Sequence, residues 1–150
     1  MELFICSVSK QNTLTEGNDS MFFVNYTNHR SSLWSDTQKC AAEVYGCIVD
    51  VPFREVPPEA DEAEIAVIAD EELKKILAYR PAAVLCQGEM TLMYALVKRL
   101  ICLNIPVLAA CSRRESIERL CGDGATVRES VFRFVRFRQF EGEPLQENAQ

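Results

Sequence analysis

The chain has 150 residues, of which 48% are hydrophobic and 25% are charged. This length and balance predict one globular domain and exclude a chain that is mainly disordered, collagen-like or coiled-coil. No apolar run is long enough to cross a bilayer, and Met1–Val8 lacks the basic leader and long apolar core of a secretion signal. We therefore expect no membrane association and a cytoplasmic location.

The seven cysteines are an odd number, and none of them forms a Cys-x-x-Cys pair. Several lie in apolar runs, where a free cysteine behaves as a small hydrophobic residue. The chain has one histidine, the ligand spacing of a zinc site is missing, and so are the fingerprints of dinucleotide and P-loop sites. We expect free thiols in a reducing compartment, no metal site and no cofactor.

The formal net charge of −6 is unevenly distributed, because residues 81–140 hold nine basic and five acidic side chains. An acidic chain argues against a groove for a long nucleic acid. The locally basic third still permits a small anionic ligand.

Strands and helices alternate after Met21. We predict an N-terminal extension over residues 1–20 that need not be ordered, a single domain over 21–143 and an acidic tail over 144–150. Within the domain the pattern predicts strands at 21–27, from Cys47 to Pro52, at 82–87, 105–112 and 131–140. It predicts helices at 34–45, within 61–79, at 89–104 and at 113–121.

The strands at 82–87 and 105–112 are unbroken apolar runs, which is typical of strands covered on both faces. The fold class is therefore predicted as α/β, with a small, doubly wound, mainly parallel sheet of the Rossmann type. In the last strand phenylalanines alternate with arginines, and the alternation slips at Val135, which indicates a bulge. We expect this strand to be antiparallel or to lie at the edge.

Ligands of open parallel sheets bind beyond the carboxyl ends of the strands, and three such ends are rich in polar residues. The first, Asn25–Ser32, carries the only histidine and fits a capped helix start and a ligand-facing loop equally well. In the second, Gln87–Thr91, Gly88 permits a tight turn, and free helix amides favour an anion. A simple turn with a cap explains it equally well.

The third strand end is Ser112-Arg113-Arg114, which we expect to open a helix. Helix starts prefer acidic residues, and guanidinium groups fit phosphate, so we favour a phosphate contact over a solvated salt bridge. Arg113 is slightly favoured over Arg114.

Other patterns predict structure rather than chemistry. The arginines of the last strand are typical of a solvent face, and the methionines and aromatic residue of 90–97 are typical of a core. We expect one solvated helix face to be formed by Glu71, Glu72, Lys74 and Lys75.

The segments QGEMT, ALVKRL, NIPVLAACSRRESIE and VFRFVRFRQFE, in this order, resemble the small stand-alone CRISPR-associated proteins with a CARF-like fold. That family includes ring nucleases, which degrade cyclic oligoadenylate messengers. The resemblance extends over about residues 21–143 and is best from 82 to 141. It implies a homodimer with a cyclic oligoadenylate, in the first place cyclic tetra-adenylate, bound on its two-fold axis.

By position the resemblance assigns ligand contacts to three loops: Thr27, Asn28 and His29; Gln87, Gly88, Glu89 and Thr91; Ser112 and Arg113. It implies metal-independent attack of a ribose 2′-hydroxyl on its phosphate. Arg113, helped by Arg114 and Thr91, would hold the phosphate, and His29 or Glu89 would move a proton.

Two alternatives stay open. One is a protein that binds cyclic oligoadenylate as a sensor without cleaving it, and the other is an unrelated nucleotide-binding regulator. The chain is too short for the second nuclease domain of CARF effectors, so we favour the ring nuclease.

Overall fold

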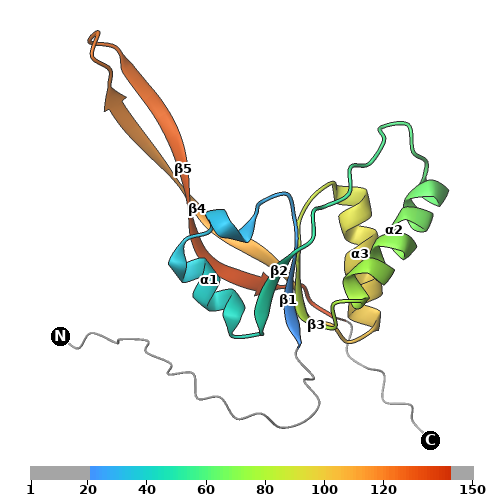
Figure 1. The fold of residues 1–150 in the computed structure, drawn as a ribbon. Helices are drawn as coiled ribbons and strands as arrows, with labels where there is room; N and C mark the ends of the chain where they lie inside the picture. Colours follow the sequence, from blue (N-terminus) through green and yellow to red (C-terminus); the bar gives the residue numbers. More distant parts are fainter. Residues whose placement is uncertain (1–20, 143–150) are drawn as a thin grey trace, which may run out of the picture.

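The computed structural model describes residues 21–142 (Figure 1), so the predicted extension (1–20) and tail (144–150) lie outside the described residues. The strands are β1 (Phe22–Tyr26), β2 (Cys47–Asp50), β3 (Pro81–Cys86), β4 (Val107–Leu120) and β5 (Thr126–Gln139). The helices are α1 (Asp36–Glu43), α2 (Glu62–Leu77) and α3 (Met90–Cys102), and a 3-10 turn (Ser31–Leu33) precedes α1.

The sheet confirms the predicted fold class. Its strand order is β2-β1-β3-β4-β5, with parallel pairing among the first four strands and antiparallel pairing between β4 and β5. Helix α1 covers one face of the sheet, and α2 and α3 cover the other (Figure 1). The last strand lies at the edge and is antiparallel, as expected from its alternating pattern.

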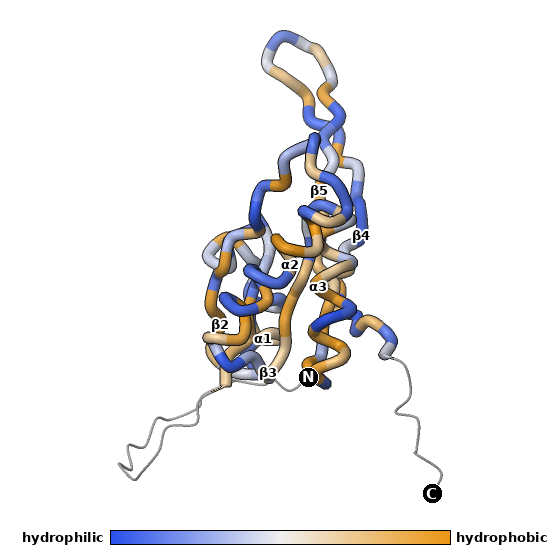
Figure 2. The backbone as a smooth tube through the Cα atoms, turned by 90° about the vertical axis from the view of Figure 1, so that its right-hand side faces the viewer, coloured by the Kyte–Doolittle hydropathy of each residue, from blue (hydrophilic) through white to orange (hydrophobic). Residues whose placement is uncertain are grey.

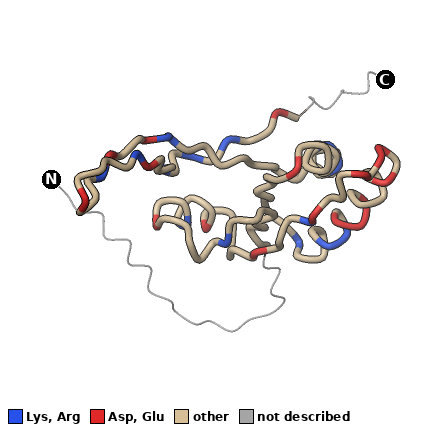
Figure 3. Tube along the Cα trace, turned by 90° about the horizontal axis from the view of Figure 1, so that it is seen from above, with Lys and Arg blue, Asp and Glu red and all other residues tan. Residues whose placement is uncertain are grey.

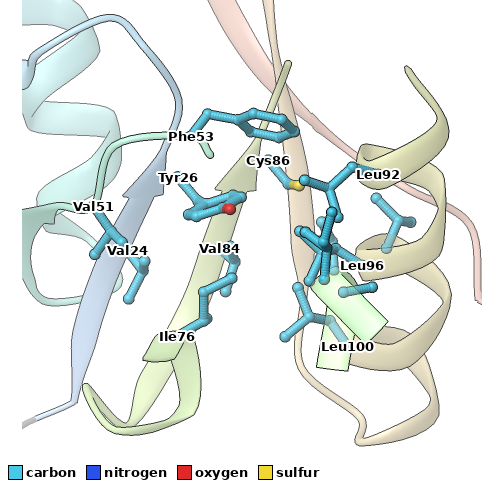
Figure 4. Close-up of a cluster of buried hydrophobic side chains, with 14 residues drawn as sticks. Val24, Tyr26, Val51, Phe53, Ile76, Val84, Cys86, Leu92, Leu96 and Leu100 are labelled. Carbon is cyan, nitrogen blue, oxygen red and sulfur yellow. The ribbon is translucent and has the colours of Figure 1, made fainter. Parts of the chain in front are cut away.

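Helices cover both faces of the sheet, and successive residues of a strand point to opposite faces, so neighbouring residues belong to different core clusters. Phe23 and Leu85 belong to the core under α1, whereas Val24 and Val84 pack with Leu96 of α3. Figure 4 shows the second of these clusters. A strand that is buried on both sides needs apolar residues at every position, which explains the continuous apolar run of β3.

Helix α2 is a single helix, in which Glu71, Lys74 and Lys75 are exposed as predicted but Glu72 is buried. Its start is fixed by a capping box between Asp61 and Glu64. Glu72 is only 2% exposed and accepts a 2.8 Å hydrogen bond from the buried Tyr26 hydroxyl. The prediction was wrong for Glu72 because its partner lies on β1, far away in the sequence.

The predicted helix at 113–121 is wrong, because β4 continues through this segment to Leu120. Strands β4 and β5 form a long hairpin whose outer part, residues 113–133, projects beyond the helices (Figure 1) and is called the arm below. Hydrophilic and hydrophobic residues alternate along it (Figure 2). Three ion pairs join its strands: Arg133–Glu115, Arg128–Glu118 and Arg119–Glu129. These cross-strand contacts favour the extended form over a local helix.

A bulge interrupts the hairpin where we predicted it. Cys111 pairs with Arg136, but Ser112 pairs with Phe134, so Val135 has no partner on β4. The extra residue leaves Phe134 and Phe137 on the same face, with their ring centroids 4.9 Å apart.

Candidate functional site

A groove of about 930 Å³ lies on the α1 side of the sheet, beyond the carboxyl ends of β1 and β3. In the sheet, β1 has β2 as its neighbour on one side and β3 on the other, so the strand order reverses at β1. Open α/β sheets bind ligands at such a switch point, beyond the carboxyl ends of the strands. Polar and charged residues from several elements line the groove: Thr27, His29, Arg30, Ser35, Thr37, Gln38, Gln87, Ser112 and Arg133.

The apolar part of the lining is formed by residues that anchor the groove to the core. Trp34 and Leu85 are buried, and Phe134 is half-buried. Phe137, behind Phe134, lies 6.2 Å from Trp34 between ring centroids. These contacts fix one wall on the hairpin and the other on the segment before α1, so the groove is preformed by packing.

Four polar side chains of the groove have donor capacity that the protein itself does not use. Within the described residues, the imidazole of His29, the guanidinium of Arg30 and the hydroxyl of Ser112 make no hydrogen bond or ion pair. Gln87 accepts a 3.2 Å bond from the amide of Ala110 through Oε1, which leaves its amide nitrogen free to donate. This set of donors suits an anionic ligand.

The first loop is held in place by a buried network. The Thr27 hydroxyl donates to Asn25 Oδ1 at 2.8 Å and accepts from the His29 amide at 3.0 Å. Asn25 Nδ2 donates to Asp50 Oδ1 at 2.7 Å and to the His29 carbonyl at 2.8 Å. Thr27 therefore shapes the loop, His29 faces the groove, and the exposed Asn28 is not part of the lining.

The second loop contributes only Gln87 to the groove. The Glu89 carboxylate caps α3, accepting from the amides of Thr91 at 3.1 Å and Leu92 at 2.9 Å, and from the Thr91 hydroxyl at 2.7 Å. The hydrogen bond from the Leu92 amide is the main cause that lowers the pKa of Glu89. The amides that we expected to hold phosphate are therefore occupied by this carboxylate.

Gly88 has a packing role in this loop. A Cβ atom at this position would lie 2.5 Å from ring carbons of Phe53. Phe53 is buried against Tyr26, with 4.9 Å between ring centroids. The absent side chain thus makes room for an aromatic ring, and Gly88 is not among the residues that line the groove.

The third strand end separates the residues that we predicted to act together. Ser112 lines the groove, but neither Arg113 nor Arg114 does. Because this segment is a strand, the two arginines extend from opposite faces of the arm. Arg114 binds the Ser130 hydroxyl through Nε at 3.1 Å and Nη2 at 2.9 Å, whereas Arg113 lies opposite Arg133 and is exposed.

The sequence analysis missed two cationic residues of the groove. Arg30 follows His29 in the first loop, and this position beside a candidate residue was the available signal. Arg133 lies on the strand whose arginines we took for a solvent face, and its guanidinium pairs with Glu115 at 2.6 Å.

Comparisons with known proteins give one match. A family model described as "Uncharacterized protein MJ1673 family" matches residues 21–138. No curated protein and no solved structure matches the chain. Within residues 21–142, no helix is long and apolar enough to span a membrane.

Proposed function

The chain belongs to the MJ1673 family, and we propose that it is a ring nuclease that binds a cyclic oligoadenylate in the groove. The proposal rests on one observation: hydrogen-bond donors that the protein does not use lie together beside an apolar wall at the switch point of the sheet. These donors belong to His29, Arg30, Gln87 and Ser112. The donors would bind phosphates, and the apolar wall would take adenine rings. The motif resemblance to CARF-like proteins supports the ligand class.

The proposed reaction needs no water. A ribose 2′-oxygen attacks the adjacent phosphorus, the bond from phosphorus to the 5′-oxygen breaks, and a 2′,3′-cyclic phosphate and a 5′-hydroxyl remain. The proton of the 2′-hydroxyl passes to a base, and the leaving 5′-oxygen takes up a proton. His29 is the candidate for this proton transfer, and Arg30 for stabilising the charge that develops on the phosphate.

The proposal includes a homodimer. A cyclic oligoadenylate carries several identical phosphates, and one groove supplies only one set of donors to them. Two copies related by a two-fold axis would present the same set twice, which matches the symmetry of such a ring. The cleavage would switch off CRISPR signalling in the cytoplasm.

Binding without cleavage is the second candidate. The observation that favours it is the free state of His29: among the described residues, no side chain hydrogen-bonds its imidazole to fix the tautomer. A sensor or sequestering protein needs only the donors and the apolar wall.

The test is incubation of the purified full chain with a panel of cyclic oligoadenylates in the presence of EDTA, followed by chromatography. We expect linear products ending in a 2′,3′-cyclic phosphate. Arg30→Ala should lower ligand affinity or turnover at least tenfold, about 1.4 kcal/mol, while Arg119→Ala, on the arm, is the control with the same change of charge.

The outcomes separate the candidates. A ring that is bound but stays intact would support the sensor. A tenfold loss in Arg113→Ala, with Arg30→Ala normal, would move the site to the arm. No binding of any ring would refute both candidates.

A further inference from the structure

Three arginines of the hairpin, Arg113, Arg136 and Arg138, lie on the side of the sheet opposite to the groove. Arg138 pairs with Ala109, Arg136 pairs with Cys111, and Arg133 pairs with Arg113 across the two strands. Side chains at 109, 111 and 113 share the side of Val107, which packs in the core with α3. We refer to Arg113, Arg136 and Arg138 as the arginine face; Arg133, which pairs with Arg113 across the strands, lines the groove and is not counted in it.

The positive charge of the arginine face is mostly uncompensated. Arg136 donates only to the Phe137 carbonyl, at 3.1 Å. Arg113 and Arg138 make no hydrogen bond or ion pair within the described residues. Like charges directly opposite in a sheet, such as Arg113 and Arg133, are destabilising.

This concentration contrasts with the chain as a whole, whose formal net charge is −6. Figure 3 shows basic and acidic residues interleaved along the hairpin, and further acidic and basic residues on the helical part. A local excess of one sign in a protein of the other sign attracts a partner of opposite charge. The arginine face therefore fits an anionic partner.

The residue types on this face indicate which kind of anionic partner it fits. Strands β4 and β5 contain arginine but no lysine, and the guanidinium fork fits phosphate oxygens. Alternate residues along a strand are about 6.8 Å apart, so the arginines form a row suited to a chain of phosphates rather than to one phosphate. On α3, which packs on the same side of the sheet, Tyr94 is 64% exposed, with Lys98 Nζ 5.6 Å from its ring centroid.

We propose that the arginine face binds single-stranded nucleic acid. The arginines hold consecutive phosphates, and Tyr94 offers a ring on which a base can stack. The site is separate from the groove, because Ser112 and Phe134, which line the groove, project from the other side of the same strands. This inference goes beyond the proposed function and does not depend on it.

Fluorescence anisotropy of the full chain with a labelled single-stranded RNA of about a dozen nucleotides tests the proposal. Three unpaired guanidiniums predict a slope of log K against log[salt] of about −2, or about 20-fold weaker binding at 200 than at 50 mM salt. Arg138→Ala should reduce the slope by about 0.7. Arg128→Ala is the control: it removes the same charge from the other side of the arm, where Arg128 lies 3.4 Å from Glu118.

Several results would overturn the proposal. One is no RNA binding at 50 mM salt, and another is an equal loss of binding in Arg138→Ala and Arg128→Ala. Tighter binding of a polyglutamate peptide or of anionic vesicles, lost in Arg138→Ala, would assign the arginine face to an acidic protein or to a membrane surface. Cleavage of cyclic oligoadenylate should be the same in Arg138→Ala and in the wild type, which separates this site from the groove.

Discussion

Replacement of Glu72 should cost more stability than replacement of its neighbour Glu71. The Glu72 carboxylate is 2% exposed and accepts hydrogen bonds from the Tyr26 hydroxyl at 2.8 Å and from Lys75 Nζ at 2.5 Å. Arg54 Nη1 lies 3.4 Å from Glu72 Oε1 and 2.6 Å from Glu71 Oε2. The two carboxylates thus share a partner and differ in burial.

The expected magnitude follows from this difference. Glu72→Ala leaves the cationic partners Arg54 and Lys75 in contact with solvent but removes the acceptor of the buried Tyr26 hydroxyl, so it should lower the free energy of unfolding by about 1–3 kcal/mol. Glu72→Gln retains an acceptor for Tyr26 and should cost about 1–2 kcal/mol. Glu71→Gln, at a side chain that is 52% exposed, should change stability much less, because exposed ion pairs contribute little.

The cost should also depend on pH. Burial opposes ionisation of Glu72, but the hydrogen bonds from Lys75 and Tyr26 outweigh it and hold the pKa of Glu72 below its ordinary value of 4.5. A lowered pKa in the folded state contributes stability above the unfolded pKa, and this contribution is lost as the pH falls through the folded pKa. The difference between wild type and Glu72→Gln should therefore be largest near neutral pH and shrink below about pH 4.5.

Urea unfolding followed by circular dichroism, for the wild type and the three variants between pH 3 and 8, measures both effects. Equal losses in Glu71→Gln and Glu72→Gln would refute the argument from burial. A difference that stays constant across the acid range would refute the argument from the lowered pKa.

Three further predictions concern the core and its glycines. Gly88→Ala should lower the free energy of unfolding by about 1–3 kcal/mol, because the new Cβ would displace the Phe53 ring, and Phe53→Leu should partly rescue it in a double-mutant cycle; simple additivity would contradict this. Gly46→Ala should destabilise by at least about 1 kcal/mol in the same assay, since Gly46 has φ +146° and a Cβ would meet the Met21 carbonyl, and an unchanged midpoint would contradict the left-handed geometry. Burial raises the pKa of Cys86 to about 12, so mass spectrometry after alkylation should find Cys40, Cys47 and Cys102 modified before Cys86, which should react only in urea.

The sequence was sufficient for the elements whose residues carry the signal themselves. An unbroken apolar run predicted β3, and an apolar stretch after Gly88 predicted α3. The segment 113–121 was different, because Ile117 and Leu120 have a spacing that also fits a helix. Its conformation is decided by β5, and pairing with a distant strand outweighs such a weak local preference.

The candidate site was predicted only in part for the same reason. His29 and Gln87 follow the ends of the parallel strands β1 and β3, and Ser112 lies on β4 just beyond the stretch that pairs with β3, so these three meet in the groove. Whether an amide is free depends on finer geometry: Glu89 could be recognised as a cap only once its carboxylate was seen on the amide of Leu92. The burial of Glu72 likewise depends on Tyr26, 46 residues earlier.

Val135, the one residue of the bulge without a partner on β4, determines which side chains of β5 lie on each side of the sheet. With strict alternation, Arg136 and Arg138 would share a side with Phe132 and Phe134. The bulge reverses this parity, so aromatic rings gather beneath α1 and cations gather beside α3. One hairpin thereby offers two surfaces of unlike character, and deleting one amino acid would mix them.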